Sequence, residues 1–396
     1  MKRHPLFGLL LAAAAAACRD AVPPFDAPEL ESGSDELRQL TFGTGDDMDP
    51  QWNGASDSVY YHSNLWYDRP ARGSLLRVAR TGGSARLIAP EAQPDANVFV
   101  GHPAPAPAAS LLAYLQFVRI ASPANCPELV AGLNYGPFFC PKPEPVLDSA
   151  VLRVRTPAAA GTAGEDPGVS ISYPGVDPRQ RRNDTTRFRQ TVWPFQMDWR
   201  EGNETTALRP SWSPDGKQVV FSNGLQLFLW RVAEPTASPI PNTTDGVAPA
   251  WSPDGQWIAF TLLEHGPGET IECACLPLPN PLVPANIIRH YRTWFPVTRQ
   301  RIALITPGGT GLRQLTDGRD PVWTPDSRTL YYRGTTDNDF AIFRLGIDGS
   351  GAGTLVPNSE RGRSPSVSPD GEWLAFARPK SATGDLDIWV TRIANR

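Results

Sequence analysis

A tight turn between two apolar strands recurs along this chain of 396 residues, with a sequence close to Trp-Ser-Pro-Asp-Gly. Its clearest copy spans residues 208–221 (LRPSWSPDGKQVVF). Proline fixes φ at the first corner, aspartate hydrogen-bonds to the backbone just after it, and glycine accepts the positive φ that closes the turn. The unit is therefore a β-hairpin signature, and its residues form a turn rather than a catalytic motif.

The hairpin unit occurs six times. Clear copies occupy residues 248–260 (APAWSPDGQWIAF), 320–332 (DPVWTPDSRTLYY) and 364–376 (SPSVSPDGEWLAF), and weaker ones residues 49–61 and 102–114. One hairpin cannot bury both of its faces, so units about 40 residues or more apart, with about four strands each, predict blades stacked around an axis. We therefore expect an all-β, six-bladed β-propeller. Seven blades are the alternative, because residues 157–206 could hold a degenerate blade.

Composition fits one turn-rich β domain. The chain has 42 prolines, 34 glycines and 40% apolar residues, with no long apolar stripe at helical spacing. Its net charge of −4 and its lack of a basic cluster argue against a nucleic-acid partner.

The N-terminal part of the domain looks like a strand without a blade. Residues 36–43 (ELRQLTFG) resemble residues 312–316 (LRQLT), which we interpret as the end of the fifth blade. The sixth blade has sequence for only three strands. We expect the N-terminal strand to complete that last blade, which closes the ring and removes two open strand edges.

Residues 1–17 predict a lipoprotein signal peptide. Lys2 and Arg3 precede an apolar run that is too short to span a bilayer, and Cys18 follows directly. The sequence Ala-Ala-Ala-Cys resembles a bacterial lipobox, although Ala15 stands where leucine is commonest. The alternative is an ordinary secretory signal with an incidental cysteine.

The lipobox resemblance implies an acylated Cys18 as the first residue of the mature protein. It also implies no inner-membrane retention, because Arg19 rather than aspartate follows. We expect an outer-membrane protein that faces the periplasm or the cell surface. Residues 18–35 are polar, acidic and proline-rich, and they predict a flexible tether before a propeller at residues 36–396.

Three excursions interrupt the regular blades, at residues 121–149, 157–206 and 264–298. The first and third of these fall between the second and third strands of a blade, so both should emerge on the same face. Long insertions of this kind are usually lids or binding loops.

Four cysteines lie in the two excursions that share a face: Cys126, Cys140, Cys273 and Cys275. Disulfides are expected in an exported chain, and three connectivities are open. We favour Cys126 with Cys140, because that short loop needs no assumption about tertiary contact. A four-cysteine zinc site is the alternative, although Cys-x-Cys is tighter than usual ligand spacing.

The chain offers little local evidence for catalysis. It has no Gly-x-Ser-x-Gly elbow, His-Glu-x-x-His pair, phosphate loop or EF-hand loop, so we expect neither a catalytic residue nor a cofactor. Each histidine is interpreted as an exposed or satisfied polar residue. Asp46, Asp47 and Asp49 form an acidic group that could bind calcium, and a solvated acidic turn is the favoured interpretation.

The repeat alignment gives a set of candidate binding residues. The residue before the aligned proline should begin each innermost strand, at the mouth of the central channel. Most of these residues are polar and they differ between blades, whereas structural roles in a repeat should recur. The ring comprises Asp49, His102, Arg209, Ala248, Asp320 and Ser364. The alternative is that these are solvated loop ends around a water-filled channel.

The motifs resemble the TolB-type β-propeller repeat, a WD40-like repeat. The resemblance rests on WSPDG at 212–216 and 251–255, WTPDS at 323–327, SPDG at 368–371, RQLT at 313–316 and DIWV at 387–390. Such repeats occur in the periplasmic protein TolB, in propeller domains of prolyl-oligopeptidase-type peptidases, in some lyases and in many lipoproteins. The chain has neither an N-terminal α/β domain nor a hydrolase domain, so we expect neither a direct Tol–Pal role nor peptidase activity.

The sequence is consistent with two hypotheses about function. The favoured one is a non-catalytic, lipid-anchored and monomeric envelope propeller that binds a protein, peptide or glycan on the channel face beside the excursions. The rival is a polysaccharide lyase or hydrolase that uses His102, Arg209 and the aspartates of the ring. A general base needs a positioned partner, and no local motif supplies one.

Overall fold

The structure is a computed structural model of the chain. It describes residues 37–42, 45–63, 74–89, 98–107, 110–120, 146–156, 166–171, 187–189, 208–224, 226–232, 234–267, 269–275, 288–295, 297–336, 339–379 and 385–393. The expected signal peptide, the tether and Cys18 lie outside these residues. The named elements are all β-strands, and none of the described segments forms a helix long and apolar enough to cross a membrane.

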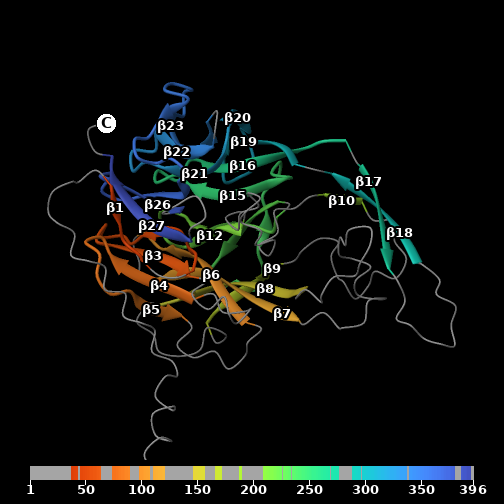
Figure 1. The fold of residues 1–396 in the computed structure, drawn as a ribbon, viewed down its shortest axis with the longest axis horizontal. Helices are drawn as coiled ribbons and strands as arrows, with labels where there is room; N and C mark the ends of the chain where they lie inside the picture. Colours follow the sequence, from red (N-terminus) through yellow and green to blue (C-terminus); the bar gives the residue numbers. More distant parts are fainter. Residues whose placement is uncertain are drawn as a thin grey trace, which may run out of the picture.

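Six antiparallel four-stranded sheets form the blades (Figure 1). Blade 1 contains β2 (Asp47–Trp52), β3 (Ser58–Ser63), β4 (Ser74–Ala79) and β5 (Arg86–Ala89). Blade 2 contains β6 (Val98–Pro105), β7 (Leu112–Ile120), β8 (Val146–Arg155) and β9 (Gly168–Ile171). Blade 3 contains β11 (Ser211–Trp212), β12 (Gln218–Ser222), β13 (Leu227–Arg231) and β14 (Ser238–Pro239).

The other three blades follow in chain order. Blade 4 contains β15 (Gly246–Trp251), β16 (Ile258–His265), β19 (Val297–Ile305) and β20 (Arg313–Asp317). Blade 5 contains β21 (Arg319–Trp323), β22 (Thr329–Thr335), β23 (Phe340–Gly346) and β24 (Thr354–Leu355). Blade 6 contains β25 (Arg363–Val367), β26 (Trp373–Pro379) and β27 (Leu386–Arg392), and it takes β1 (Arg38–Gln39) as its fourth strand.

The first strand of each blade lines the centre of a closed ring. β2 contacts β6, β6 contacts β11, and the series continues through β15, β21 and β25 back to β2. The predicted six-bladed propeller is therefore confirmed. The described parts of residues 157–206 form no seventh blade, because β9 is the outer strand of blade 2 and β10 (Arg187–Arg189) pairs with an inserted strand instead.

The ring closes as the sequence predicts. β1 pairs antiparallel with β27, with Arg38 opposite Val390 and Gln39 opposite Trp389. The Gln39 side chain donates a hydrogen bond to Asp387 at 2.9 Å, and the next residue, Leu40, is 1% exposed. The last blade is therefore built from strands of both ends of the domain.

One blade assignment from the sequence is wrong. Residues 312–316 were expected to end the fifth blade, but β20 pairs with β19 and is the outer strand of blade 4. The first strand of blade 5, β21, begins only at Arg319, after this strand, so the backbone of residues 313–317 pairs with the nearer edge of β19.

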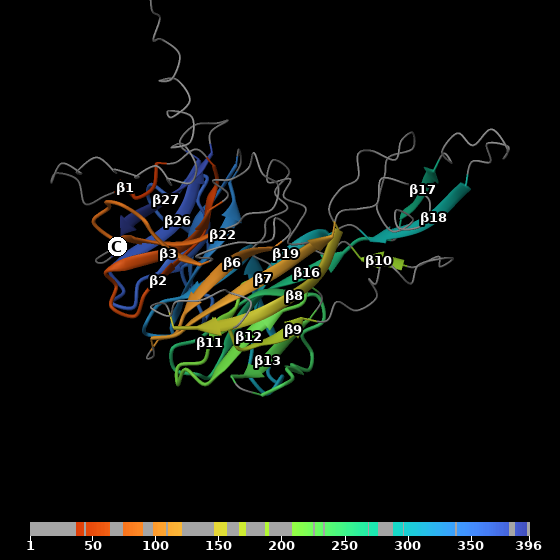
Figure 2. The same ribbon diagram turned by 90° about the horizontal axis from the view of Figure 1, so that it is seen from below.

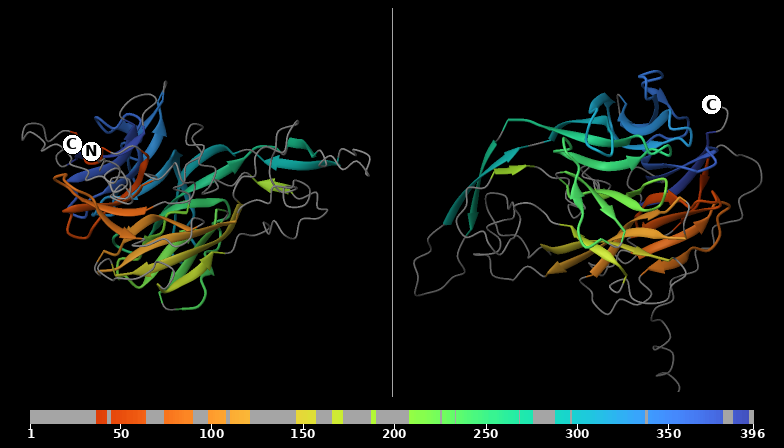
Figure 3. Two further views of the ribbon diagram at one scale, coloured as in Figure 1. Left: turned by 60° about the horizontal axis from the view of Figure 1, so that its bottom comes forward. Right: turned by 180° about the vertical axis from the view of Figure 1, so that it is seen from behind.

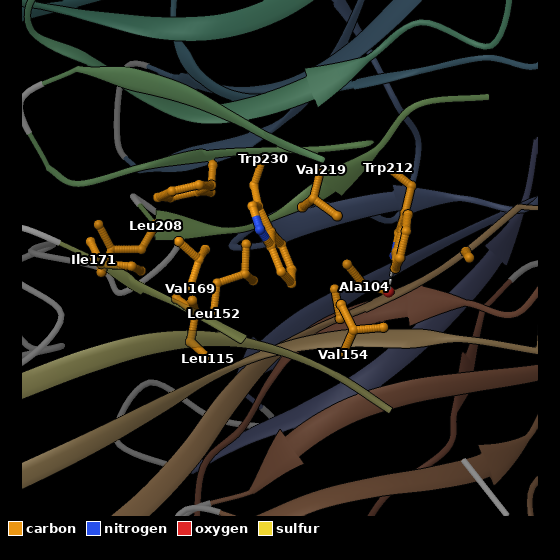
Figure 4. Close-up of a cluster of buried hydrophobic side chains, with 13 residues drawn as sticks. Ala104, Leu115, Leu152, Val154, Val169, Ile171, Leu208, Trp212, Val219 and Trp230 are labelled. Atoms are coloured by element: carbon orange, nitrogen blue, oxygen red, sulfur yellow. Dashed lines mark hydrogen bonds between the residues drawn. The ribbon is translucent and has the colours of Figure 1, made fainter. Parts of the chain in front are cut away.

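The hydrophobic core is divided among the gaps between neighbouring blades. One cluster joins each adjacent pair of blades around the ring. Figure 4 shows the cluster between blades 2 and 3, where Leu115, Leu152 and Val169 meet Trp212 and Trp230. Each blade is thus stabilised by burial of apolar surface against both of its neighbours.

The two ends of the channel differ. We call the end that carries the tight turns after the first strands, such as residues 213–217, the turn face. The opposite end is the excursion face, because the connections from β7 to β8 and from β16 to β19 leave there. The second of these connections forms the hairpin β17 (Glu269–Cys275) and β18 (Ile288–Phe295), which projects away from the blades together with β10 (Figures 2 and 3).

Candidate functional site

The turns of the turn face are built by side chains of the repeat. The Ser213 hydroxyl donates to Asp215 at 2.6 Å and accepts the backbone N–H of Gln218 at 2.9 Å. The Asp215 carboxylate also accepts the N–H of Lys217 at 3.1 Å. The same arrangement recurs at residues 252–257, 324–329 and 368–373. The repeat residues therefore form turns, as the sequence predicts.

Three of the tryptophans that end the first strands connect neighbouring blades. The Trp52 indole N–H donates to the Ser366 carbonyl at 3.0 Å, that of Trp212 to Ala104 at 2.7 Å, and that of Trp323 to Ala250 at 3.0 Å. Each bond runs from one blade to the preceding blade of the ring. The indole N–H groups are thus used in the scaffold, and only the ring faces remain for contact with a ligand.

The candidate ring from the sequence lies at a β-bulge. In blade 1, Met48 is opposite His62 and Gln51 is opposite Tyr60, so Asp49 and Pro50 together face Tyr61. Asp49, His102, Ala248, Asp320 and Ser364 all have φ between 50° and 55°. This conformation is unfavourable for non-glycine residues. Its recurrence in five blades indicates that the bulge belongs to the fold, while the side chains it carries differ.

The structure places these ring residues deeper than expected. Most lie inside the innermost strand instead of at its start, and all six are at most 4% exposed: Asp49, His102, Arg209, Ala248, Asp320 and Ser364. They are therefore not solvated loop ends.

Four polar side chains of this region come together from three blades. The Asp49 carboxylate lies 2.7 Å from His102 Nδ1 and 3.3 Å from His62 Nδ1. Its other oxygen lies 3.8 Å from an Arg209 nitrogen. Asp320 lies apart from this group, 3.3 Å from Arg319, and its backbone N–H donates to Thr261 at 3.0 Å. The sequence ring thus splits into a cluster around Asp49 and separate residues.

Burial and charge act in opposite directions on this cluster. Burial alone would raise the pKa of Asp49, but the neighbouring His102, His62 and Arg209 outweigh it and hold the pKa well below its usual range. Burial lowers the pKa of His62 to about 4, although Asp49 partly opposes this shift. Asp49 is therefore ionised and His62 neutral near pH 7.

A cavity of about 380 Å³ occupies the channel at the turn face. Its wall contains the residue two positions after the predicted ring residue in every blade: Gln51, Ala104, Ser211, Ala250, Val322 and Ser366. The next residue of every blade also lines it: Trp52, Pro105, Trp212, Trp251, Trp323 and Val367. The turn prolines Pro107, Pro214, Pro253, Pro325 and Pro369 complete the rim.

Five of the six predicted ring residues do not line this cavity. Arg209 is the only member of the predicted ring among the described residues that line it. The bulge puts two residues opposite one, which changes the phase of alternation along the strand. The recurring positive φ leaves no signal in the repeat sequence, so the register of the cavity wall was not predicted.

Arg209 spans the channel between opposite blades. It precedes β11 in blade 3, and its guanidinium donates to the Pro365 carbonyl in blade 6 at 3.3 Å. Its side chain is 5% exposed. Arg209 therefore lies between the turn-face cavity and the Asp49 cluster.

The other sequence candidates are distributed as follows. Asp46 and Asp47 are buried, at 3% and 1% exposed, so the expected solvated acidic turn is wrong; the closing strand and blade 6 cover them. Within the described segments, no group of three or more His, Cys, Asp or Glu residues could hold a metal ion. Cys126 and Cys140 lie outside the described residues, and Cys273 and Cys275 lie on β17 opposite His290 and Ile288.

Comparison with known protein families finds no match. Over 72 residues the chain is 39% identical to an uncharacterized protein of Agrobacterium fabrum, Atu1656, and this match covers 18% of the chain and 24% of that protein. TolB from Acinetobacter baumannii aligns with 86% of the chain and 64% of its own length, at 14% identity and a TM-score of 0.49. A putative TolB from Agrobacterium tumefaciens aligns with 90% of the chain and 97% of its own length, at 12% identity and a TM-score of 0.45.

An oligogalacturonate lyase from Vibrio parahaemolyticus aligns with 91% of the chain and 94% of its own length, at 9% identity and a TM-score of 0.39. Similar solved structures thus include proteins that carry the TolB name and an enzyme. The blade count and the ring closure rest on the chain's own strand pairing.

Proposed function

We propose that this chain is a non-catalytic, lipid-anchored envelope protein that binds a protein, peptide or glycan in its central channel. The observation that carries the proposal is the turn-face cavity. Its wall uses equivalent positions of six blades, yet those positions hold residues as different as Gln51, Ser211 and Val322. Turn formation does not require different residues at equivalent positions of the blades, whereas a wall shaped around one ligand does require them.

The binding face that we propose differs from the one that the sequence favoured. The excursions leave from the opposite end of the channel, and residues 121–145 are outside the described part of the chain. The cavity instead lies among the described tryptophans and prolines of the turn face. We therefore assign the primary ligand contact to the turn face.

Anchoring and location rest on the N-terminal sequence. An apolar segment that ends in Ala-Ala-Ala-Cys and a polar, proline-rich stretch fit an acylated Cys18 and a tether. We propose an outer-membrane location, with the monomeric propeller facing the periplasm or the cell surface.

The test compares partner capture by the native protein with capture by a variant of the cavity wall. Cross-linked pull-down from envelope and a glycan array would compare the native chain with Ala250→Phe, which enlarges a side chain at the cavity wall, with folding of the variant confirmed by an unchanged melting temperature. Ala352→Phe is the matched control, because Ala352 is exposed on the outer part of blade 5. We expect Ala250→Phe to abolish capture and Ala352→Phe to retain it. Capture that survives in both variants would contradict a channel site.

One observation favours the rival enzyme function. The 2.7 Å contact of His102 Nδ1 with Asp49 is the kind of pairing that orients a general base. The His102 side chain is only 3% exposed, so a substrate would need an opening to reach it. Turnover of a polysaccharide that His102→Gln abolishes, with an unchanged melting temperature, would establish this function in place of the first.

A further inference from the structure

Arg209 is the only charged residue among the described residues that line the turn-face cavity. Its Nε and one terminal nitrogen are buried without a hydrogen-bond partner in the described part of the chain. The side-chain nitrogen of Gln51, on the same cavity, is also buried without one. Buried donors are normally paired, because an unpaired one loses the free energy of its hydrogen bonds with water.

These donors need an acceptor, and the charge of Arg209 favours an anionic one. A carboxylate has two oxygens and accepts hydrogen bonds only, so it suits a cavity that offers a guanidinium and an amide as donors. Asp49 does not fill this role, since its nearest oxygen is 3.8 Å from Arg209 and its other oxygen lies 2.7 Å from His102.

The rest of the cavity selects an apolar ligand. The indole N–H groups of Trp52, Trp212 and Trp323 are bonded to backbone carbonyls. The Ser211 hydroxyl accepts the Trp251 backbone N–H at 3.0 Å, and Ser252 is bonded within its turn. Few polar groups remain for the many hydroxyls of a sugar, which would lose their bonds to water.

We propose that the turn-face cavity binds the carboxyl terminus of a peptide or protein, with the terminal carboxylate at Arg209 and Gln51 and apolar side chains against the tryptophans and prolines. This inference rests on the proposed channel function and names its ligand class. A cavity of about 380 Å³ is within the size range of ligand sites and accepts the end of a chain rather than a folded domain.

The experiment uses two matched pools of fluorescein-labelled pentapeptides. Both have random sequences that end in Leu, Val or Phe, and they differ only in a free carboxylate or a carboxamide at the C-terminus. Anisotropy titration with the intact protein should show binding of the carboxylate pool, and affinity for the carboxamide pool should be lower by about tenfold or more.

Variants of the same protein locate the carboxylate. Arg209→Gln should bring the two pools to equal affinity, and Gln51→Ala should reduce their ratio. The control is Arg231→Gln, the same substitution at a residue of blade 3 whose side chain is 68% exposed; it should change neither affinity. If Arg209→Gln does not fold, the ratio of the two pools with the native protein and with Gln51→Ala decides the question.

Three results would overturn the inference: equal affinity for both pools, no binding of either, or stronger binding of a uronic-acid oligosaccharide than of the carboxylate pool. The proposed function is judged separately by partner capture. Capture that Ala250→Phe blocks, without any preference for a free carboxylate, would overturn only the ligand class. If Ala250→Phe does not block capture and the peptides show no preference for a free carboxylate, the channel site is overturned as well.

Discussion

Arg209 of blade 3 donates a hydrogen bond to the Pro365 carbonyl of blade 6, 3.3 Å away across the central channel. Blades 3 and 6 are opposite one another in the ring, so one side chain connects the two halves of the propeller. The same guanidinium lies 3.8 Å from the buried Asp49 of blade 1. A cation in this position stabilises the ring and charges one end of the cavity.

We predict that Arg209→Met and Asp49→Asn are coupled. Arg209→Met should destabilise the protein by about 2–4 kcal/mol, because it leaves a buried carboxylate with less compensation. The double variant should lose less than the sum of the single losses, since each residue compensates the other. Urea unfolding of the four proteins measures this coupling. Strict additivity would show that the 3.8 Å contact contributes nothing to stability.

The closing strand gives a second prediction. A chain that begins at Gly45 loses β1, the bond from Gln39 to Asp387 and the buried Leu40. Exposure of two strand edges should lower the free energy of unfolding by several kcal/mol and increase aggregation. A chain that begins at Glu36 is the control and should melt like the mature protein. Equal melting of both truncations would show that the ring closes without β1.

Membrane anchoring gives a third prediction. Cys18→Ser should move the protein from the membrane pellet to the soluble fraction of the host cell, because acylation needs the thiol. Acyl chains contribute about 0.8 kcal/mol for each buried methylene, so their loss removes stable attachment. The native chain, fractionated in parallel, is the reference. If Cys18→Ser still pellets with the membrane, another attachment must hold the protein there.

The fold was readable from the sequence because its signals are local and repeated. Pro214, Asp215 and Gly216 specify a turn by themselves, and the resemblance of residues 36–43 to a later outer strand was sufficient to predict ring closure. The candidate site was less readable. The bulge at Asp49 shifts the register of the innermost strand, and the pairing of Trp52 with Ser366 joins residues far apart in the chain. Neither relationship leaves a local pattern, so the ring two residues further along was missed.

A last prediction concerns Asp47, which lies at the closure near Asp387. Burial raises the pKa of Asp47 to about 7, and the nearby Asp387 and Asp46 add to this shift while hydrogen bonds with Ser63 and Thr41 oppose it. As the pH rises, the folded state therefore keeps the Asp47 proton up to about pH 7, whereas the unfolded chain, with an ordinary pKa of 3.8, releases it at a lower pH. The contribution of Asp47 to stability is complete below pH 3.8 and is lost as the pH rises through 7.

Asp47→Asn should remove this pH dependence, because an amide resembles the protonated acid and does not titrate. Between pH 5 and pH 8, the native protein should lose about 2–3 kcal/mol relative to the variant. Urea unfolding at several pH values measures the difference. Glu360→Gln, at an exposed carboxylate, is the control and should keep the native slope. Parallel stability curves for Asp47→Asn and the native protein would mean that Asp47 ionises in the folded state without penalty, and that the closure is not sensitive to pH through this residue.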